Sequence, residues 1–204
     1  RGRETTWKVY GDGMAVLAGD GLLNLAYETA ALAFDMAGNM EDIKRAAHAL
    51  KILGKKAGVY GMIGGQTADL KAEADGQISG ERLLFIHENK TAALIQAAMT
   101  IGPVLAGAKE EEVSAMERAA ANIGIAFQIQ DDILDVVSTE EVLGKPVGSD
   151  ERNHKLTYVS LYGLEKAREE VGSLSGEALA VLGSFGIRNE FLEELVKALI
   201  TREK

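Results

Sequence analysis

Three aspartates fall within five residues of a stretch that otherwise has the apolar pattern of a buried helix. They are Asp131, Asp132 and Asp135. On a helix Asp131 and Asp135 are four positions apart, so their Cβ atoms lie ~5–6 Å from each other and their charges repel. Mg²⁺ would reverse that repulsion, because it binds one or two carboxylates and completes its shell with phosphate oxygens and water. The pattern predicts that these three carboxylates hold a diphosphate through magnesium.

Two faces are expected on this helix when it is turned by ~100° per residue. One face holds Gly124, Phe127, Gln128, Asp131 and Asp135, the opposite face holds Ile125, Ile129, Ile133 and Val136, and Asp132 lies at the flank of the acidic face. We expect the aliphatic face to pack into a core and the acidic face to meet the ligand.

Two lysines, Lys145 and Lys155, follow the acidic stretch and flank a segment that contains Gly and Pro. Such residues predict a loop over 143–153. The loop would bring both ammonium groups near the C-terminal end of the acidic helix. Lysine acts as a point charge on phosphate, so the two side chains are expected to bind the same anion directly.

The composition predicts one all-α domain over residues 1–204. The chain has 204 residues, 47% of them hydrophobic, and only two prolines. This supports a substantial core built from long helices. No alternating strand pattern is present, which favours a bundle of packed helices.

Charge and hydropathy exclude several classes of function. A net charge of -9 argues against nucleic-acid binding, which needs a basic face. The absence of cysteine fits a reducing cytoplasm, and no uncharged apolar run reaches the ~18 residues of a membrane span. The start has neither the apolar stretch of a signal peptide nor an initiator Met, which predicts that the chain begins inside a longer protein.

Hydrophobic periodicity predicts where the helices lie. The expected ranges are 14–34 (interrupted at Gly19 and Gly21), 40–56, 81–88, 92–108 (kinked at Pro103), 110–138, 154–171, 175–182 and 189–202. Gln66 and Asp69 are expected to cap or cross-link helices. His48, His87 and His154 lack metal-ligand spacing and are expected to be non-catalytic.

A series of short motifs runs in one order from the first residue to Tyr158. The motifs are Arg1-Gly2, Ala18-Gly19-Asp20, Gly65-Gln66 with Asp69-Leu70, Lys90-Thr91, the acidic stretch 127–135, and Gly144-Lys145 through Asp150 to Lys155. The series resembles the C-terminal two-thirds of trans-isoprenyl diphosphate synthases (polyprenyl synthetases), such as bacterial geranylgeranyl and farnesyl diphosphate synthases.

The resemblance implies an isoprenoid-synthase-like helical bundle around a central cavity. It implies a magnesium-dependent, head-to-tail condensation of isopentenyl diphosphate with an allylic diphosphate. The product would be a short-chain prenyl diphosphate such as farnesyl or geranylgeranyl diphosphate. It further implies up to three Mg²⁺ ions and a homodimer.

Residue roles also follow from the resemblance. Asp131, Asp132 and Asp135 would bind metal, and Asp131, Asp132, Lys145 and Lys155 would serve catalysis. The substrate contacts would be Lys90, Thr91, Phe127, Gln128, Lys145 and Lys155 for the allylic substrate, and Arg1 for isopentenyl diphosphate. Phe127 would supply an apolar wall for the prenyl chain, and Gly124 would leave room beside it.

The sequence departs from the family at its start. The first aspartate-rich motif and the upstream Lys and Arg that bind isopentenyl diphosphate are absent, and Glu4 and Trp7 stand where the family often has Pro and His. Either the chain is part of a longer enzyme or it is a truncated, inactive form. We favour the first, because the remaining catalytic positions are intact.

Three other functions were compared with this one. A terpene cyclase needs Ser or Thr, then Glu, in its second metal motif, and here Asp135 and Thr139 occupy those positions. A non-catalytic partner subunit of a prenyltransferase predicts decayed acidic residues, and these are intact. A helical interaction domain predicts no magnesium-dependent diphosphate binding.

Overall fold

The regular elements are helices in every part of the chain that the computed structural model describes, which is residues 3–76, 78–138, 156–186 and 189–202. The predicted all-α fold is therefore confirmed. The chain divides into two compact units, Arg1–Lys51 and Ile52–Lys204. The single domain over 1–204 stays a prediction.

The first unit is dominated by helix α1 (Thr6–Asp35), which contains no buried residue. The predicted interruption at Gly19 and Gly21 is wrong, because α1 runs through both positions. A helical glycine costs about 1 kcal/mol relative to alanine and does not by itself end a helix. The kink lies instead at Gly11, whose φ of 80° is a conformation that favours glycine.

Helix α2 (Met40–Ala57) begins in the first unit and continues into the second. Asn39 fixes its start, since the side-chain oxygen of Asn39 accepts a hydrogen bond from the backbone N–H of Asp42 (3.0 Å). Glu41 and Asp42 occupy the first turn, where the helix dipole favours anions. The predicted range, 40–56, is confirmed to within one residue.

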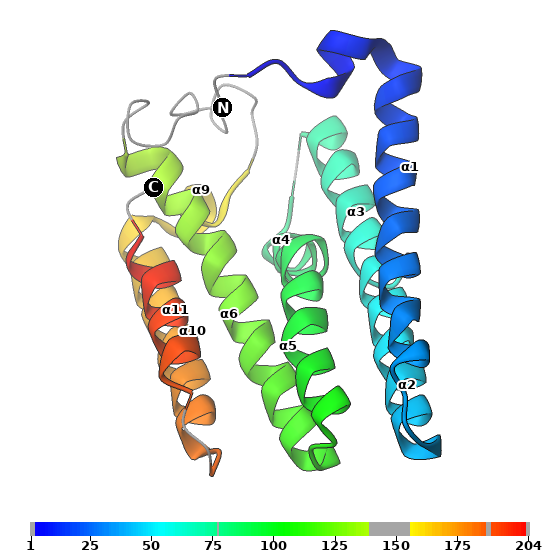
Figure 1. Ribbon diagram of the computed structural model, residues 1–204. Coiled ribbons are helices and arrows are strands. Elements are labelled where there is room, and N and C mark those ends of the chain that lie inside the picture. Colours follow the sequence, from blue (N-terminus) through cyan, green and yellow to red (C-terminus); the bar gives the residue numbers. More distant parts are fainter. Residues whose placement is uncertain (1–2, 77, 139–155, 187–188, 203–204) are drawn as a thin grey trace. The chain divides into compact units, whose positions relative to one another are not determined.

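The remaining helices all lie in the second unit (Figure 1). They are α3 (Met62–Asp75), α4 (Gly80–Ile86), η1 (His87–Thr91), α5 (Ala92–Ala106), α6 (Glu110–Val137), α9 (Tyr158–Tyr162), α10 (Leu164–Ser184) and α11 (Glu190–Thr201). The predicted helix at 110–138 is confirmed as α6. The predicted division between 171 and 175 is wrong, because α10 is continuous there and the break falls at Gly163 (φ 85°).

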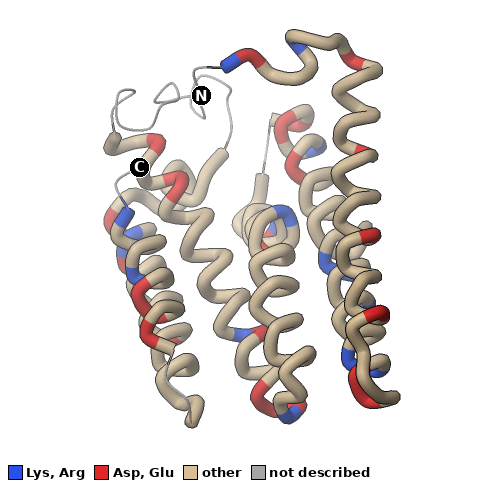
Figure 2. The backbone as a smooth tube through the Cα atoms, in the orientation of Figure 1, with Lys and Arg blue, Asp and Glu red and all other residues tan. Residues whose placement is uncertain are grey.

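Helix α6 packs against α5 and α10 and forms the centre of the second unit. Its aliphatic side is buried as predicted, with Ile125, Ile129 and Ile133 between 0 and 9% exposed. They join Ala92 of α5 and Val171 of α10 in one hydrophobic core. Figure 2 shows α5 without a charged residue, in keeping with its burial.

One member of the predicted aliphatic face behaves differently. Val136 is 58% exposed. It lies in the last turn of α6, which ends at Val137, so its side chain does not contribute to the core as the periodicity predicts.

Helix η1 is a single π-helical turn between α4 and α5, where the sequence pattern indicates a break between two helices. Single π turns inside longer helices often accompany functional sites. Two glycines let neighbouring helices approach η1 and the start of α5. A Cβ at Gly65 would lie 2.1 Å from the backbone nitrogen of Lys90, and one at Gly124 would lie 2.3 Å from the Cβ of Ala92. Gly124 therefore makes room for α5, and not for a ligand as expected.

This packing predicts opposite effects for the same substitution at two helical glycines. Gly65→Ala should lower the free energy of unfolding by about 1–3 kcal/mol, because the new methyl group overlaps the backbone of η1. Gly172→Ala is the matched control: it lies inside α10 with open space around its Cβ, and should raise stability by about 0.5–1 kcal/mol. Urea titrations followed by circular dichroism measure both values, and equal effects would contradict the close approach.

Candidate functional site

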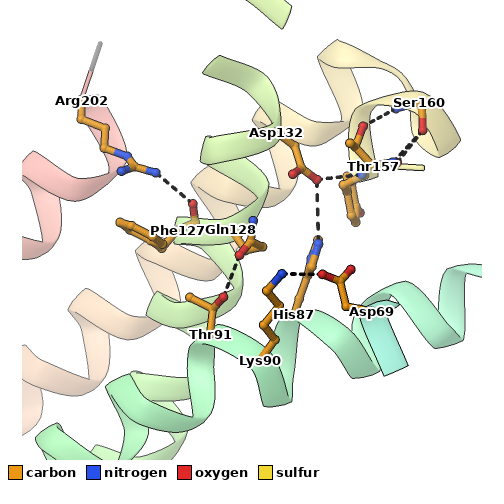
Figure 3. Close-up of polar contacts among 11 residues, drawn as sticks. Asp69, His87, Lys90, Thr91, Phe127, Gln128, Asp132, Thr157, Ser160 and Arg202 are labelled. Atoms are coloured by element: carbon orange, nitrogen blue, oxygen red, sulfur yellow. Dashed lines mark hydrogen bonds and ion pairs between the residues drawn. The ribbon is translucent and has the colours of Figure 1, made fainter. Parts of the chain in front are cut away.

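The site residues of the second unit gather where η1 faces α3 and α6 (Figure 3). Lys90 of η1 forms an ion pair with Asp69 of α3. The Asp69 residue is only 5% exposed, and a buried carboxylate needs such a partner. Asp69 thus cross-links two helices, as predicted, and fixes the direction of the Lys90 ammonium group.

Thr91 and Gln128 are also brought together. The Thr91 hydroxyl donates a hydrogen bond to the side-chain oxygen of Gln128 over 2.8 Å. This contact joins η1 to α6 and places Gln128 near Lys90, with which it lines one small cavity. The structure therefore places Lys90, Thr91 and Gln128 beside one another, although 37 positions separate Thr91 from Gln128.

The middle aspartate, Asp132, lies inside the protein, although its position at the flank of the acidic face predicts ligand contact. It is 3% exposed, and its Oδ2 accepts a hydrogen bond from the backbone N–H of Tyr158 (2.8 Å). The same oxygen lies 3.8 Å from Nε2 of His87, which is itself buried. Asp132 therefore connects η1, α6 and the start of α9.

The start of α9 is held by a reciprocal cap. The backbone N–H of Thr157 donates to the Ser160 hydroxyl (2.8 Å), and the backbone N–H of Ser160 donates to the Thr157 hydroxyl (3.2 Å). Capping of this kind satisfies donors that a helix start leaves free. Together with Asp132 it fixes where the chain enters α9 (Figure 3).

Burial also affects the titration of Tyr158. Burial raises the pKa of its hydroxyl above the ordinary value of 10.0, and nearby Glu170 and Tyr162 raise it further. The Tyr158 ring lies 4.7 Å from that of Tyr162 and packs against the core around α6.

The first aspartate, Asp131, is paired with an arginine that the sequence pattern does not indicate. Nη2 of Arg202 lies 2.9 Å from Oδ1 of Asp131 and 3.3 Å from the carbonyl oxygen of Phe127. The guanidinium carbon lies 3.9 Å from the centroid of the Phe127 ring. Because 71 positions separate Asp131 from Arg202, only tertiary structure reveals the pair.

The three aspartates have different surroundings. Asp131 meets Arg202, Asp132 meets His87 and Tyr158, and Asp135 is 3% exposed. Within the described ranges, no three His, Cys, Asp or Glu side chains converge in a way that could hold a metal ion. Asp131, with 39% of its side chain exposed, is the most accessible of the three carboxylates.

A cavity of about 20 Å³ lies among these residues. Its walls are Asp69, Leu83, Ile86, His87, Lys90, Gln128, Asp132, Leu156 and Thr157. This volume is about that of one water molecule by the same measure, so a diphosphate does not fit inside it. Lys145, Lys155 and Arg1 lie outside the described residues.

The fold and site define a class of protein: an all-α protein in which a lysine and a threonine on a π turn face an amide side chain on an acidic helix. Residues 1–181 match the polyprenyl synthetase family. The chain therefore belongs to the polyprenyl synthetase family. No helix in the described part of the chain is both long and apolar enough to cross a membrane.

Individual relatives agree with this placement. The chain is 39% identical over 206 residues to farnesyl diphosphate synthase of Bacillus subtilis, covering 100% of this chain and 67% of the relative. It superposes on the geranylgeranyl pyrophosphate synthetase of Pyrococcus horikoshii with a TM-score of 0.86 and 28% identity, covering 100% of this chain and 71% of that one.

A third comparison is with a liganded structure. The geranyltransferase of Helicobacter pylori, complexed with magnesium and isoprenyl diphosphate, has a TM-score of 0.78 and 33% identity, covering 97% of this chain and 63% of that one. The present chain spans about half to two thirds of the length of the curated relatives it matches.

The contacts of Asp132 predict how two substitutions differ. Asp132→Ala removes the acceptor for the buried N–H of Tyr158 and should lower the free energy of unfolding by about 1–3 kcal/mol. Asp132→Asn keeps an oxygen that can accept this bond, and should lower the free energy of unfolding by less. Asp75→Ala is the control, because it removes the exposed ion pair with Arg82 (2.9 Å) and should cost under about 1 kcal/mol. Equal losses for the Ala and Asn variants, measured in urea, would show that the hydrogen bond is unimportant.

Proposed function

We propose that this chain belongs to a prenyltransferase that condenses isopentenyl diphosphate with an allylic diphosphate to give a short-chain prenyl diphosphate. Membership of the polyprenyl synthetase family supports this reaction. The observation that carries the proposal is the placement of Lys90, Thr91 and Gln128 beside one another, on elements that face each other.

Lys90, Thr91 and Gln128 are proposed to bind the diphosphate of the allylic substrate. Lys90 supplies positive charge, and Asp69 holds its ammonium group in place. Thr91 and Gln128 supply a hydroxyl and an amide that can exchange their mutual hydrogen bond for bonds to the ligand. Lys145, Lys155 and Arg1, outside the described residues, are proposed as further diphosphate contacts.

Magnesium is part of the proposal. Mg²⁺ takes one or two carboxylates and fills the rest of its shell with phosphate oxygens and water. The accessible carboxylate of Asp131 fits this chemistry, whereas Asp132 already accepts a backbone hydrogen bond. We therefore propose Asp131 as the first metal ligand, with Asp132 and Asp135 in supporting positions. The related structure from Helicobacter pylori, complexed with magnesium and isoprenyl diphosphate, supports the involvement of magnesium.

In the proposed reaction the allylic C–O bond breaks and diphosphate leaves. The double bond of isopentenyl diphosphate attacks the allylic carbon, a new C–C bond forms, and a proton is lost. Lys90 stabilises the negative charge that grows on the leaving diphosphate, which is electrostatic stabilisation of the transition state. When bound, the metal acts as a Lewis acid on the same group.

Further features stay predictions of the family resemblance. They are up to three Mg²⁺ ions, a homodimer, a cytoplasmic location, and farnesyl or geranylgeranyl diphosphate as the product. A truncated or non-catalytic partner subunit is the alternative. It predicts diphosphate binding without turnover.

Asp131→Ala tests the proposed reaction in the enzyme that carries this chain. Loss of this carboxylate should lower kcat by at least ~100-fold, the usual effect of removing one group that stabilises the transition state. Steady-state assays with radiolabelled isopentenyl diphosphate and an allylic diphosphate measure kcat. Glu111→Ala, an exposed carboxylate in the first turn of the same helix, should leave kcat unchanged. A decrease of only a few-fold for the Asp131 variant would contradict the assigned role.

Lys90→Ala tests ligand binding without turnover. Removing a charge-assisted contact should weaken magnesium-dependent binding of an allylic diphosphate by about 10- to 100-fold. Calorimetry with and without Mg²⁺ measures this, and Lys71→Ala, an exposed lysine on α3, is the control. If wild type shows no binding that depends on Mg²⁺, the chain is a helical interaction domain and the proposed function is wrong.

A further inference from the structure

Arg202 directly follows helix α11 and reaches back to the acidic helix. Its guanidinium group bonds to Oδ1 of Asp131 and to the carbonyl oxygen of Phe127, and it covers the Phe127 ring. In the opposite direction, the side-chain amide of Gln130 donates to the backbone carbonyl of Arg202 (3.3 Å). The end of α11 is thus fastened to α6 at the carboxylate most accessible to a metal.

The guanidinium group of Arg202 uses only part of its hydrogen-bonding capacity in this attachment. Nε of Arg202 is buried and makes no hydrogen bond within the described part of the chain. A buried donor without an acceptor carries a desolvation cost that the contacts of the other nitrogens must offset. With 19% of its side chain exposed, Arg202 also keeps a route to solvent. The contact is therefore one that a stronger cation can displace.

Arg202 and a divalent ion compete for the same carboxylate. Both need Oδ1 of Asp131, and two cations at one oxygen repel each other at short distance. A divalent ion carries twice the charge of a guanidinium group and binds oxygen more closely. Occupation of Asp131 by metal therefore weakens its pair with Arg202.

We propose that Arg202 is a positioning residue that holds Asp131 in the metal-free protein and gives up this carboxylate when a divalent cation binds. The proposal rests on the assignment of Asp131 as a metal ligand under the proposed function. It adds that metal binding releases the Arg202 side chain from α6 and so loosens the end of α11.

Two consequences follow from the geometry. Release of Arg202 uncovers the face of Phe127 that its guanidinium group now occupies, and this ring is the one expected to border the prenyl chain. The rest of α11 stays in place, because Val196 is 2% exposed in the core formed with α6 and α10. The change is therefore confined to the last turn of α11, and metal binding makes an apolar surface available.

Calorimetric titration with Mg²⁺ alone tests the exchange. Arg202→Ala should bind Mg²⁺ about 3- to 10-fold more tightly than wild type, because the competing cation is gone. Arg202→Lys keeps one charge but loses the planar guanidinium group. Its affinity for Mg²⁺ should therefore lie between those of wild type and Arg202→Ala. Lys197→Ala is the matched control: it removes an equal charge from α11, where Lys197 pairs only locally with Glu194 (2.8 Å), and should bind as wild type does. Circular dichroism checks that every variant is folded.

Hydrogen exchange gives a second readout that does not depend on affinity. In wild type, amides at residues 199–202 should exchange faster when Mg²⁺ is added, and in Arg202→Ala they should exchange fast without it. Unchanged or weaker Mg²⁺ binding by Arg202→Ala, or unchanged protection of these amides, would overturn the exchange. Asp131→Ala separates the assignment of Asp131 as a metal ligand from the displacement of Arg202. If Asp131→Ala does not weaken Mg²⁺ binding, the metal assignment itself fails. If it does weaken Mg²⁺ binding but Arg202→Ala has no effect, only the displacement of Arg202 is refuted.

Discussion

Neutralisation of buried charge is the constraint on which the site depends. Removing a carboxylate from water is costly unless a donor or an opposite charge replaces the water. The second unit meets this need for two buried carboxylates, by pairing Lys90 with Asp69 and the Tyr158 N–H with Asp132. A third pairing joins Arg202 to the partly exposed Asp131. Each pairing joins segments that are far apart in sequence. The polar contacts therefore hold the helices in register and aim the side chains at the same time.

Backbone geometry provides the second condition. The π turn at η1 sets the directions of His87, Lys90 and Thr91. Gly65 lets α3 sit against the backbone of η1, and Gly124 lets α6 sit against Ala92 at the start of α5. A side chain at Gly65 would push η1 away from α3, and one at Gly124 would push the start of α5 away from the acidic helix. The close packing of α3, η1 and α6 thus fixes the distance between the cationic residues and the carboxylates, and the chemistry of the proposed prenyl transfer depends on that distance.

The acidic residues have different surroundings. Asp132 is buried and accepts a hydrogen bond from the backbone of α9, whereas Asp131 remains accessible and pairs with Arg202. Their roles as metal ligands stay predictions. His87, expected to be non-catalytic, lies against Asp132.

Local sequence determined the helical class, the ranges of α2 and α6, the burial of Ile125, Ile129 and Ile133, and the motifs that mark the family. These features depend on propensity and periodicity, which act between near neighbours in the chain. Tertiary structure alone decided that η1 is a π turn, that Gly124 makes room for Ala92, and that Arg202 pairs with Asp131. Those outcomes are set by atoms brought together from distant segments. No spacing rule within one helix contains that information, because the energy of a contact depends on which partner the fold supplies.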